Sequence, residues 1–146
     1  MEVSVTATIG SGFARRVAPI CCGAALAAGA GFLATHDPAA AGARYPGCVF
    51  HQTTGLWCPG CGLTRGTYQL LHGHVGAALG YNIFTPLAIA AIVVVWVGWL
   101  RTSWDMPALR LPASGARLIA TILPVLLITY GVLRNIPASP FRSLAP

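Results

Sequence analysis

The chain has 146 residues, of which 55% are hydrophobic and 8% are charged, and its mean hydropathy is +0.69. Ordinary soluble domains are about a quarter charged, so this composition excludes a typical soluble domain and predicts an all-α integral membrane protein. The formal net charge is +6, from nine basic residues, all of them Arg, and three acidic ones. Apart from Arg15-Arg16 the arginines are scattered and form no basic stripe, so we expect no nucleic-acid partner. So few acidic residues nearly exclude catalysis by paired carboxylates.

The hydropathy pattern divides the chain into two tails and one membrane domain. We expect a mobile N-terminal tail over residues 1–16, a single membrane domain over residues 17–137 and a C-terminal tail over residues 138–146. Within the membrane domain, apolar runs predict three transmembrane helices, over residues 17–34, 83–100 and 118–133. As helices, the first two runs extend about 27 Å and the third about 24 Å, close to the hydrocarbon thickness of a bilayer.

The first apolar run follows Arg15-Arg16 and has two interpretations. A secretory signal peptide would use the arginine pair as its n-region and Ala41-Gly42-Ala43 as its cleavage site. However, the run is longer than a usual h-region of about 7 to 15 residues, and the small-residue site lies well beyond its end. We therefore expect a retained transmembrane helix.

Residues 46–82 carry a cysteine-rich loop and, from Gly62 onward, a predicted short helix that is amphipathic or half-buried. Small residues recur along this helix at spacings that place them on one face, where another backbone can approach closely. These residues are Gly62, Gly66, Gly73, Ala77 and Gly80. The pattern favours packing against a membrane protein partner or a second copy of the chain.

The cysteine-rich loop and the C-terminal tail are separated by two predicted spans, so they lie on the same side of the membrane in either orientation. With a cytoplasmic N-terminus, five arginines face the cytoplasm and four face outward, a small excess in the direction of the positive-inside rule. We therefore expect an integral protein of the bacterial plasma membrane, with its N-terminus in the cytoplasm and the cysteine-rich loop outside.

The loop holds three of the five cysteines, Cys48, Cys58 and Cys61. The turn between Cys58 and Cys61 brings two sulfurs together and resembles one knuckle of a zinc ribbon. Cys48 can supply a third ligand and His51, in the same loop, a fourth, so the loop predicts a site for zinc or iron. His72 is too far away to join this site, because it lies eleven residues beyond Cys61, about 16 Å along a continuous helix.

A disulfide or a redox pair would use the same sulfurs. Cys61 is expected at the start of the following helix, where backbone N–H groups lower a thiol pKa, and Arg65 adds positive charge one turn later. Cys58 and Cys61 would then be the active pair of a membrane thiol-disulfide oxidoreductase, with Cys48 as a second exchanging thiol. We place a structural staple, made by a metal or a disulfide, ahead of catalysis, because most cysteine clusters in small domains hold shape.

Three further polar residues stand near the predicted membrane interface. Arg65 and Arg134 are expected on the same face of the membrane, where together they can clamp an anionic headgroup or a carboxylate. Each arginine can instead snorkel and anchor a helix end, which we favour for Arg134. Asn82 is predicted to cap the second span or to bond a nearby backbone group.

The run from Cys48 to Asn82 resembles the membrane proteins called domain of unknown function 2752. The resemblance rests on Cys48, Thr54-Gly55-Leu56, Cys58-Pro59-Gly60-Cys61-Gly62-Leu63-Thr64-Arg65, Leu70-Leu71-His72-Gly73 and Asn82. Leu133-Arg134-Asn135 is similar to the closing motif of the family, which extends the resemblance to about Pro137. The chain departs from the family at Ile83, where Pro is usual, and at Gly66, where Ala is common. The resemblance implies a small membrane protein with this cysteine loop, and it implies no substrate or reaction.

These observations favour a non-enzymatic accessory or structural subunit whose loop is stapled at the membrane surface. Its expected partners are the lipid bilayer and either a second membrane protein or another copy of the chain. A thiol-disulfide oxidoreductase that uses Cys58 and Cys61 is the alternative. Binding of a lipid or a small anion through Arg65 and Arg134 is a third hypothesis.

Overall fold

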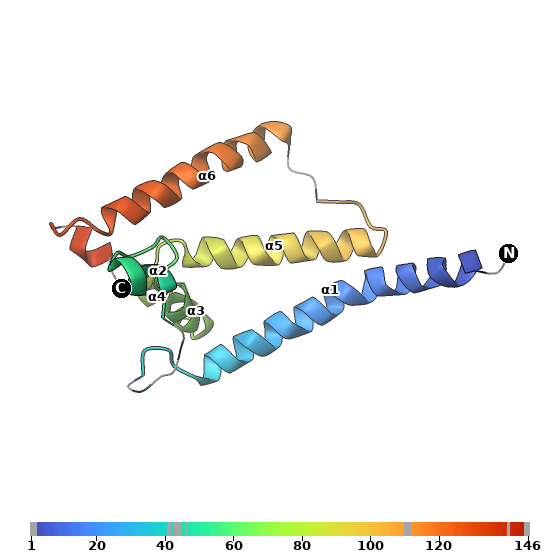
Figure 1. Ribbon diagram of the computed structural model, residues 1–146, viewed down its shortest axis with the longest axis horizontal. Coiled ribbons are helices and arrows are strands. Elements are labelled where there is room, and N and C mark those ends of the chain that lie inside the picture. Colours follow the sequence, from blue (N-terminus) through green and yellow to red (C-terminus); the bar gives the residue numbers. More distant parts are fainter. Residues whose placement is uncertain are drawn as a thin grey trace. The chain divides into compact units, whose positions relative to one another are not determined.

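The computed structural model describes residues 3–40, 42, 45, 47–109, 112–139 and 141–144, with side chains from residue 12 onward except at 142 and 143. Every regular element among these residues is helical, which confirms the all-α prediction (Figure 1). The elements are α1 (Val3–Thr35), α2 (Val49–Thr54), α3 (Leu63–Leu71), α4 (Val75–Tyr81), α5 (Thr85–Ser103), α6 (Ala113–Leu133) and the 3-10 helix η1 (Phe141–Leu144).

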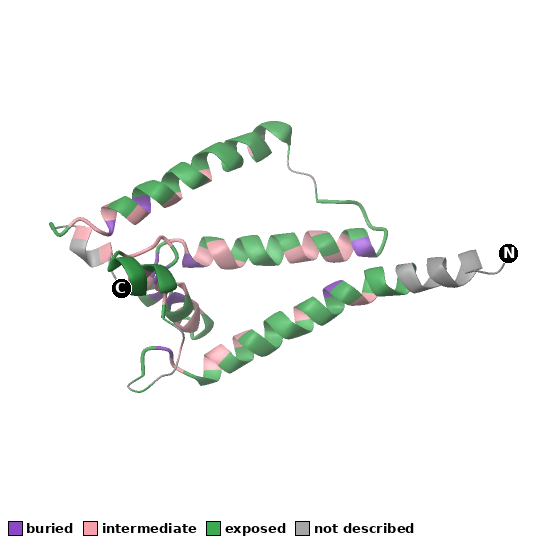
Figure 2. Ribbon diagram, viewed as in Figure 1, coloured by how far each residue is buried: buried purple, intermediate pink, exposed green. Residues whose placement is uncertain are grey.

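Three of these helices are long and apolar enough to cross a membrane, judged by length and composition. They provide the spans Gly12–Thr35, Thr85–Ser103 and Ala113–Leu133. Most of their side chains are exposed (Figure 2), and helices that stay apolar on their exposed faces suit contact with lipid. The chain is therefore an integral membrane protein with three apolar spans, as its composition predicts.

Two helices begin earlier than the hydropathy pattern predicts. α1 already has helical backbone from Val3, within the segment that we expected to be a mobile tail. α6 begins at Ala113 rather than at residue 118, because its polar first turn still contains good helix formers even though it lowers the local hydropathy. The small-residue site considered for a signal peptide falls partly on Ala41 and Ala43, which lie outside the described residues.

The segment after the cysteine loop forms two short helices, α3 and α4, rather than one. The chain turns between them at Gly73, whose φ is +77°, a conformation that residues with a Cβ rarely adopt. The turn is closed by hydrogen bonds from the backbone N–H groups of Gly73 to Leu70 O (3.0 Å) and of His74 to Gln69 O (2.9 Å). The glycines of this segment therefore do not lie along one continuous helical face.

The described residues divide into two compact units, and the first comprises residues 1–32 and 90–110. In this unit Trp96 packs directly on α1, where its indole Nε1 donates to the carbonyl of Pro19 at 2.8 Å. A Cβ added to Gly23 would lie 2.5 Å from the indole ring of Trp96, so the indole needs a glycine at this position. The contact explains why a large aromatic side chain can lie against this helix.

Asp105, just beyond α5, joins α1 to α5 within the same unit. Arg15 and Arg16 both pair with its carboxylate, and these two guanidinium groups hold the pKa of Asp105 below its usual range. Arg15 also donates to the carbonyls of Thr102 (3.2 Å) and Ser103 (3.4 Å). These carbonyls belong to the last turn of α5, where no intrahelical partner is available. Arg15 thus caps the end of α5 in addition to pairing with Asp105.

The second unit comprises residues 33–89 and 111–146 and holds α2, α3, α4, the start of α5, α6 and η1. Its buried residues include Gly66, Ala78, Asn82, Thr85 and Arg134. Gly66 lets α3 approach α4 and the start of α5, because a Cβ there would lie 2.4 Å from Thr85 Oγ1 and 3.1 Å from Ala78 O. This close approach within the chain accounts for one of the small residues that the sequence assigned to a partner-facing surface.

We expect Gly66→Ala to lower the stability of the detergent-solubilised protein by about 1 to 2 kcal/mol, because overpacking outweighs the gain in helix propensity. Gly80→Ala is the matched control, since open space surrounds Gly80, and it should leave stability equal or higher. Combining Gly66→Ala with Thr85→Ala should restore part of the loss. Thermal unfolding measures all three variants, and equal effects at Gly66 and Gly80 would contradict the packing described here.

Candidate functional site

The cysteine turn follows α2 and leads into α3. The backbone N–H of Cys61 donates to Cys58 O at 3.1 Å, and that of Leu63 donates to Gly60 O at 3.1 Å. Gly62 has a φ of +87°, which redirects the chain from this turn into α3 and requires a residue without a Cβ. This conformation gives a physical reason for the glycine that follows the second cysteine of the motif.

The structure brings the three loop cysteines together. Cys58 Sγ lies 3.3 Å from Cys48 Sγ and 3.0 Å from Cys61 Sγ, and all three sulfurs lie within 4.8 Å of one another. A tetrahedral zinc ion holds each sulfur at about 2.3 Å, which places two ligating sulfurs about 3.8 Å apart. All five cysteines of the chain are present as thiols. Small shifts of these three side chains would therefore let them hold a metal ion.

The thiols of this cluster have different acidities. Hydrogen bonding from the backbone at His51, and then from the thiols of Cys58 and Cys61, lowers the pKa of Cys48 to about 7. Burial, and then hydrogen bonding with Cys58 and Cys48, raises the pKa of Cys61 to about 12. The expectation that the helix start lowers the pKa of Cys61 is therefore wrong for the metal-free thiol, because desolvation of the charged form outweighs the helix.

Arg134 lies against the backbone of the cysteine turn. Its side chain is 2% exposed, and its Nη1 donates to Cys61 O at 2.8 Å and to Cys58 O at 3.1 Å. The guanidinium carbon lies 5.0 Å from the centre of the Tyr130 ring, which adds a cation–π contact. The prediction that Arg134 snorkels toward the interface is wrong, because the carbonyls of Cys58 and Cys61 provide acceptors inside the protein.

Asn82, which lies just before α5, also binds the backbone of this turn. It is fully buried, and its Nδ2 donates to Pro59 O (2.7 Å) and Cys61 O (3.0 Å). Its Oδ1 accepts a hydrogen bond from the backbone N–H of Phe84 at 2.9 Å, just before α5. The structure therefore confirms that Asn82 bonds nearby backbone groups.

Asn135 fixes the residue that precedes the turn. Its Oδ1 accepts from the backbone N–H of Trp57 at 2.8 Å, and its Nδ2 donates to Trp57 O at 2.9 Å. The same Nδ2 donates to Gly131 O at 2.7 Å, near the end of α6. Residue-level reasoning gave Asn135 no role, and only the family resemblance included it. The signal was its position directly after an apolar span, on the membrane side that holds the loop.

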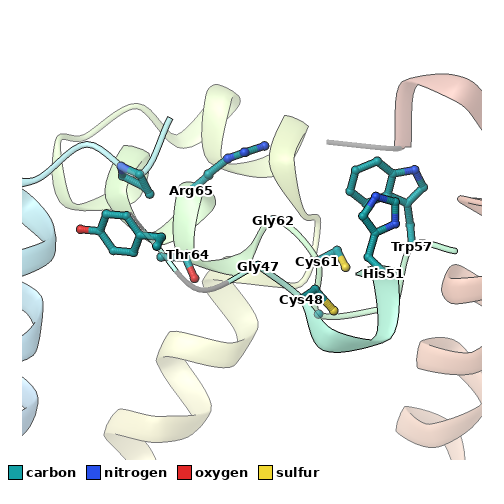
Figure 3. A pocket seen from close by; sticks show the side chains of 11 residues that line it. Gly47, Cys48, His51, Trp57, Cys61, Gly62, Thr64 and Arg65 are labelled. Carbon is teal, nitrogen blue, oxygen red and sulfur yellow. The ribbon is translucent and has the colours of Figure 1, made fainter. Parts of the chain in front are cut away.

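A pocket of about 380 Å³ opens beside the cysteines. Its lining includes Cys48, Cys61, His51, Trp57, Thr64 and Arg65 (Figure 3). The ring of His51 stacks on that of Trp57, with ring centres 3.8 Å apart, and its Nδ1 lies 3.2 Å from Leu56 O. His51 thus shares the pocket with two of the sulfurs, although it is not part of the close group that the three cysteines form.

The remaining predicted residues lie apart from the sulfurs. Arg65 is exposed and faces the pocket, whereas Arg134 is buried behind the turn, so the two do not form an exposed pair for a headgroup. His72 is exposed, and its Nδ1 lies 2.9 Å from Tyr68 O in α3. This position agrees with the prediction that His72 does not join the cysteine site.

The fold and the site define a small helical membrane protein that carries a three-cysteine cluster. Residues 48–96 match the family described as "Protein of unknown function (DUF2752)", which confirms the resemblance over the cysteine loop, α2, α3, α4 and most of α5. The matched segment ends before Arg134 and Asn135. No curated protein and no solved structure matches the chain.

The different acidities of the thiols predict an order of alkylation in reduced, chelator-treated protein. Only a thiolate reacts with iodoacetamide, so Cys48 should react half-maximally near pH 7, while Cys61 stays protonated and slow throughout the neutral range. Mass spectrometry of peptides after short pulses at several pH values measures both rates. The same protein denatured in detergent should lose the difference. Equal rates for the two cysteines in the folded protein would contradict the burial of Cys61.

Proposed function

We propose that the chain is a non-enzymatic accessory or structural membrane subunit whose surface loop is held by a zinc or iron ion at Cys48, Cys58 and Cys61. The observation that carries this proposal is the convergence of these three sulfurs within 4.8 Å of one another. Thiolates are the ligands that structural zinc sites and iron–sulfur centres use most. Cys48 comes from the start of α2, so an ion at these sulfurs would join two parts of the loop.

The charge of Arg134 supports a metal over a disulfide. This guanidinium is buried, and the ion pairs found among the described residues join only Arg15 and Arg16 to Asp105. A buried charge is costly unless an opposite charge or strong hydrogen bonds compensate it. A divalent ion with three thiolates carries a net charge of −1, which complements Arg134, whereas thiols and disulfides are neutral.

The hydrogen bonds between side chains and the backbone of the cysteine turn support a structural role. Arg134 and Asn135 follow α6 and Asn82 precedes α5, and all three bind backbone groups of residues 57–61. An ion would bind the cysteine side chains of the loop, while these three residues bind its backbone groups. Both sets of contacts favour one fixed shape of the loop beside the membrane.

A thiol-disulfide oxidoreductase is the second candidate function. The 3.0 Å separation of the sulfurs of Cys58 and Cys61 and the pKa of about 7 at Cys48 favour it, since a thiolate at neutral pH can attack a disulfide. The burial of Cys61 and the raised pKa of its thiol count against it. We therefore place this function behind the metal staple.

Elemental mass spectrometry of the detergent-purified protein should find one metal ion per chain. Cys58→Ser should abolish this metal, because two thiolates and an open coordination shell bind far more weakly. Cys21→Ser, which changes a thiol in the exposed part of α1, should retain it. A maleimide probe should label the loop cysteines only after a chelator is added. Absence of metal, together with labelling after mild reduction alone, would favour the oxidoreductase and contradict the metal staple.

The charge of Arg134 should tune the affinity for metal. We expect Arg134→Gln to weaken metal binding by about tenfold or more, as the loss of groups that support metal ligands commonly does. Arg134→Lys keeps the charge and should lose less, while Arg117→Gln, which changes an exposed arginine within α6, should match the wild type. Competition with a chromophoric chelator measures these affinities. Equal losses for Lys and Gln at position 134 would show that hydrogen bonding, not charge, links Arg134 to the metal.

A further inference from the structure

The proposed metal centre has three protein ligands where zinc and iron sites usually have four. The described residues that come together as a metal-binding group are Cys48, Cys58 and Cys61. His51 was predicted as the fourth ligand, but its ring is stacked on Trp57 and its Nδ1 lies against Leu56 O. A site with three protein ligands has one coordination position open, and in metalloproteins that position takes water or an external ligand.

The open position can be reached from the pocket beside the cluster. Cys48 and Cys61 both line this pocket of about 380 Å³ (Figure 3), a volume in the lower part of the range for small-molecule sites. The stacked rings of His51 and Trp57 form part of its lining. An ion held by the three sulfurs would therefore be accessible to a small molecule that enters here.

Arg65 brings a positive charge to the pocket. Its side chain is exposed and lines the same pocket, and no acidic residue is among the described lining residues. The ion pairs found in the described part of the chain do not involve Arg65. Its guanidinium is thus available to a carboxylate of a ligand, a pairing for which its planar set of donors is suited.

We propose that the pocket binds a small organic thiol that carries a carboxylate, with its sulfur on the metal and its carboxylate against Arg65. This inference rests on the metal centre proposed above. A sulfur donor suits a metal that already has thiolate ligands. The thiol gives its proton to water as its sulfur coordinates, because sulfur binds metals as the thiolate. No bond within the ligand breaks and no electron is transferred.

Cobalt(II) in place of the native ion provides a direct test, because each coordinated thiolate adds to the sulfur-to-cobalt charge-transfer absorption. The cobalt protein is titrated with mercaptopropionate and mercaptohexanoate, and with mercaptopropanol and mercaptohexanol as uncharged controls of matched length. We expect at least one acid to bind about fivefold more tightly than its alcohol, the size of a partly exposed ion pair. Arg65→Gln should remove this preference, while Arg117→Gln should keep it.

His51→Ala distinguishes an external fourth ligand from a protein ligand. We expect this variant to retain the cobalt–thiolate bands and to bind the acid as the wild type does. Loss of the bands in this variant would identify His51 as the fourth ligand and overturn the inference. If no added thiol changes the cobalt–thiolate bands of the wild type, or if acid and alcohol bind equally, the inference is overturned while the metal centre stands. Absence of cobalt–thiolate bands in the wild type would instead overturn the metal centre itself, and this inference with it.

Discussion

A buried guanidinium ties the cysteine turn to the last transmembrane helix, and the arrangement of the second unit depends on that contact. The carbonyls of Cys58 and Cys61 lie in a turn outside any regular hydrogen-bond ladder, and Arg134 donates to both of them. The guanidinium in turn needs acceptors because it is 2% exposed. Moving the turn away would therefore leave the buried guanidinium without these two acceptors.

Two asparagines also hold the backbone of the cysteine turn and of the residue before it. Asn82 binds carbonyls within the turn, and Asn135 binds both backbone groups of Trp57 just before it. These amides connect an irregular segment to the start of α5 and the end of α6. The sulfurs of Cys58 and Cys61 therefore project from a backbone that is fixed by side chains rather than by regular secondary structure, which is the condition for a preorganised ligand site.

The parts of this structure that follow from local physical rules could be predicted from the sequence. Long apolar runs predict spans because the bilayer requires them, and the spacing of Cys58 and Cys61 predicts adjacent sulfurs. The break at Gly73 was missed because the helical pattern continues on both sides of it. The burial of Arg134 was missed for a different reason. An arginine after a span can face headgroups or protein, and the choice depends on where distant carbonyl acceptors lie in space.

The contacts that hold the cysteine turn are far apart in the sequence, since Arg134 is 76 residues from Cys58 and 73 from Cys61. During biosynthesis the cysteines emerge from the ribosome long before the residues that fix their backbone. The turn can take its final shape only after the last span has been inserted into the membrane. Formation of the thiol cluster is therefore a late event that is coupled to insertion of the last span.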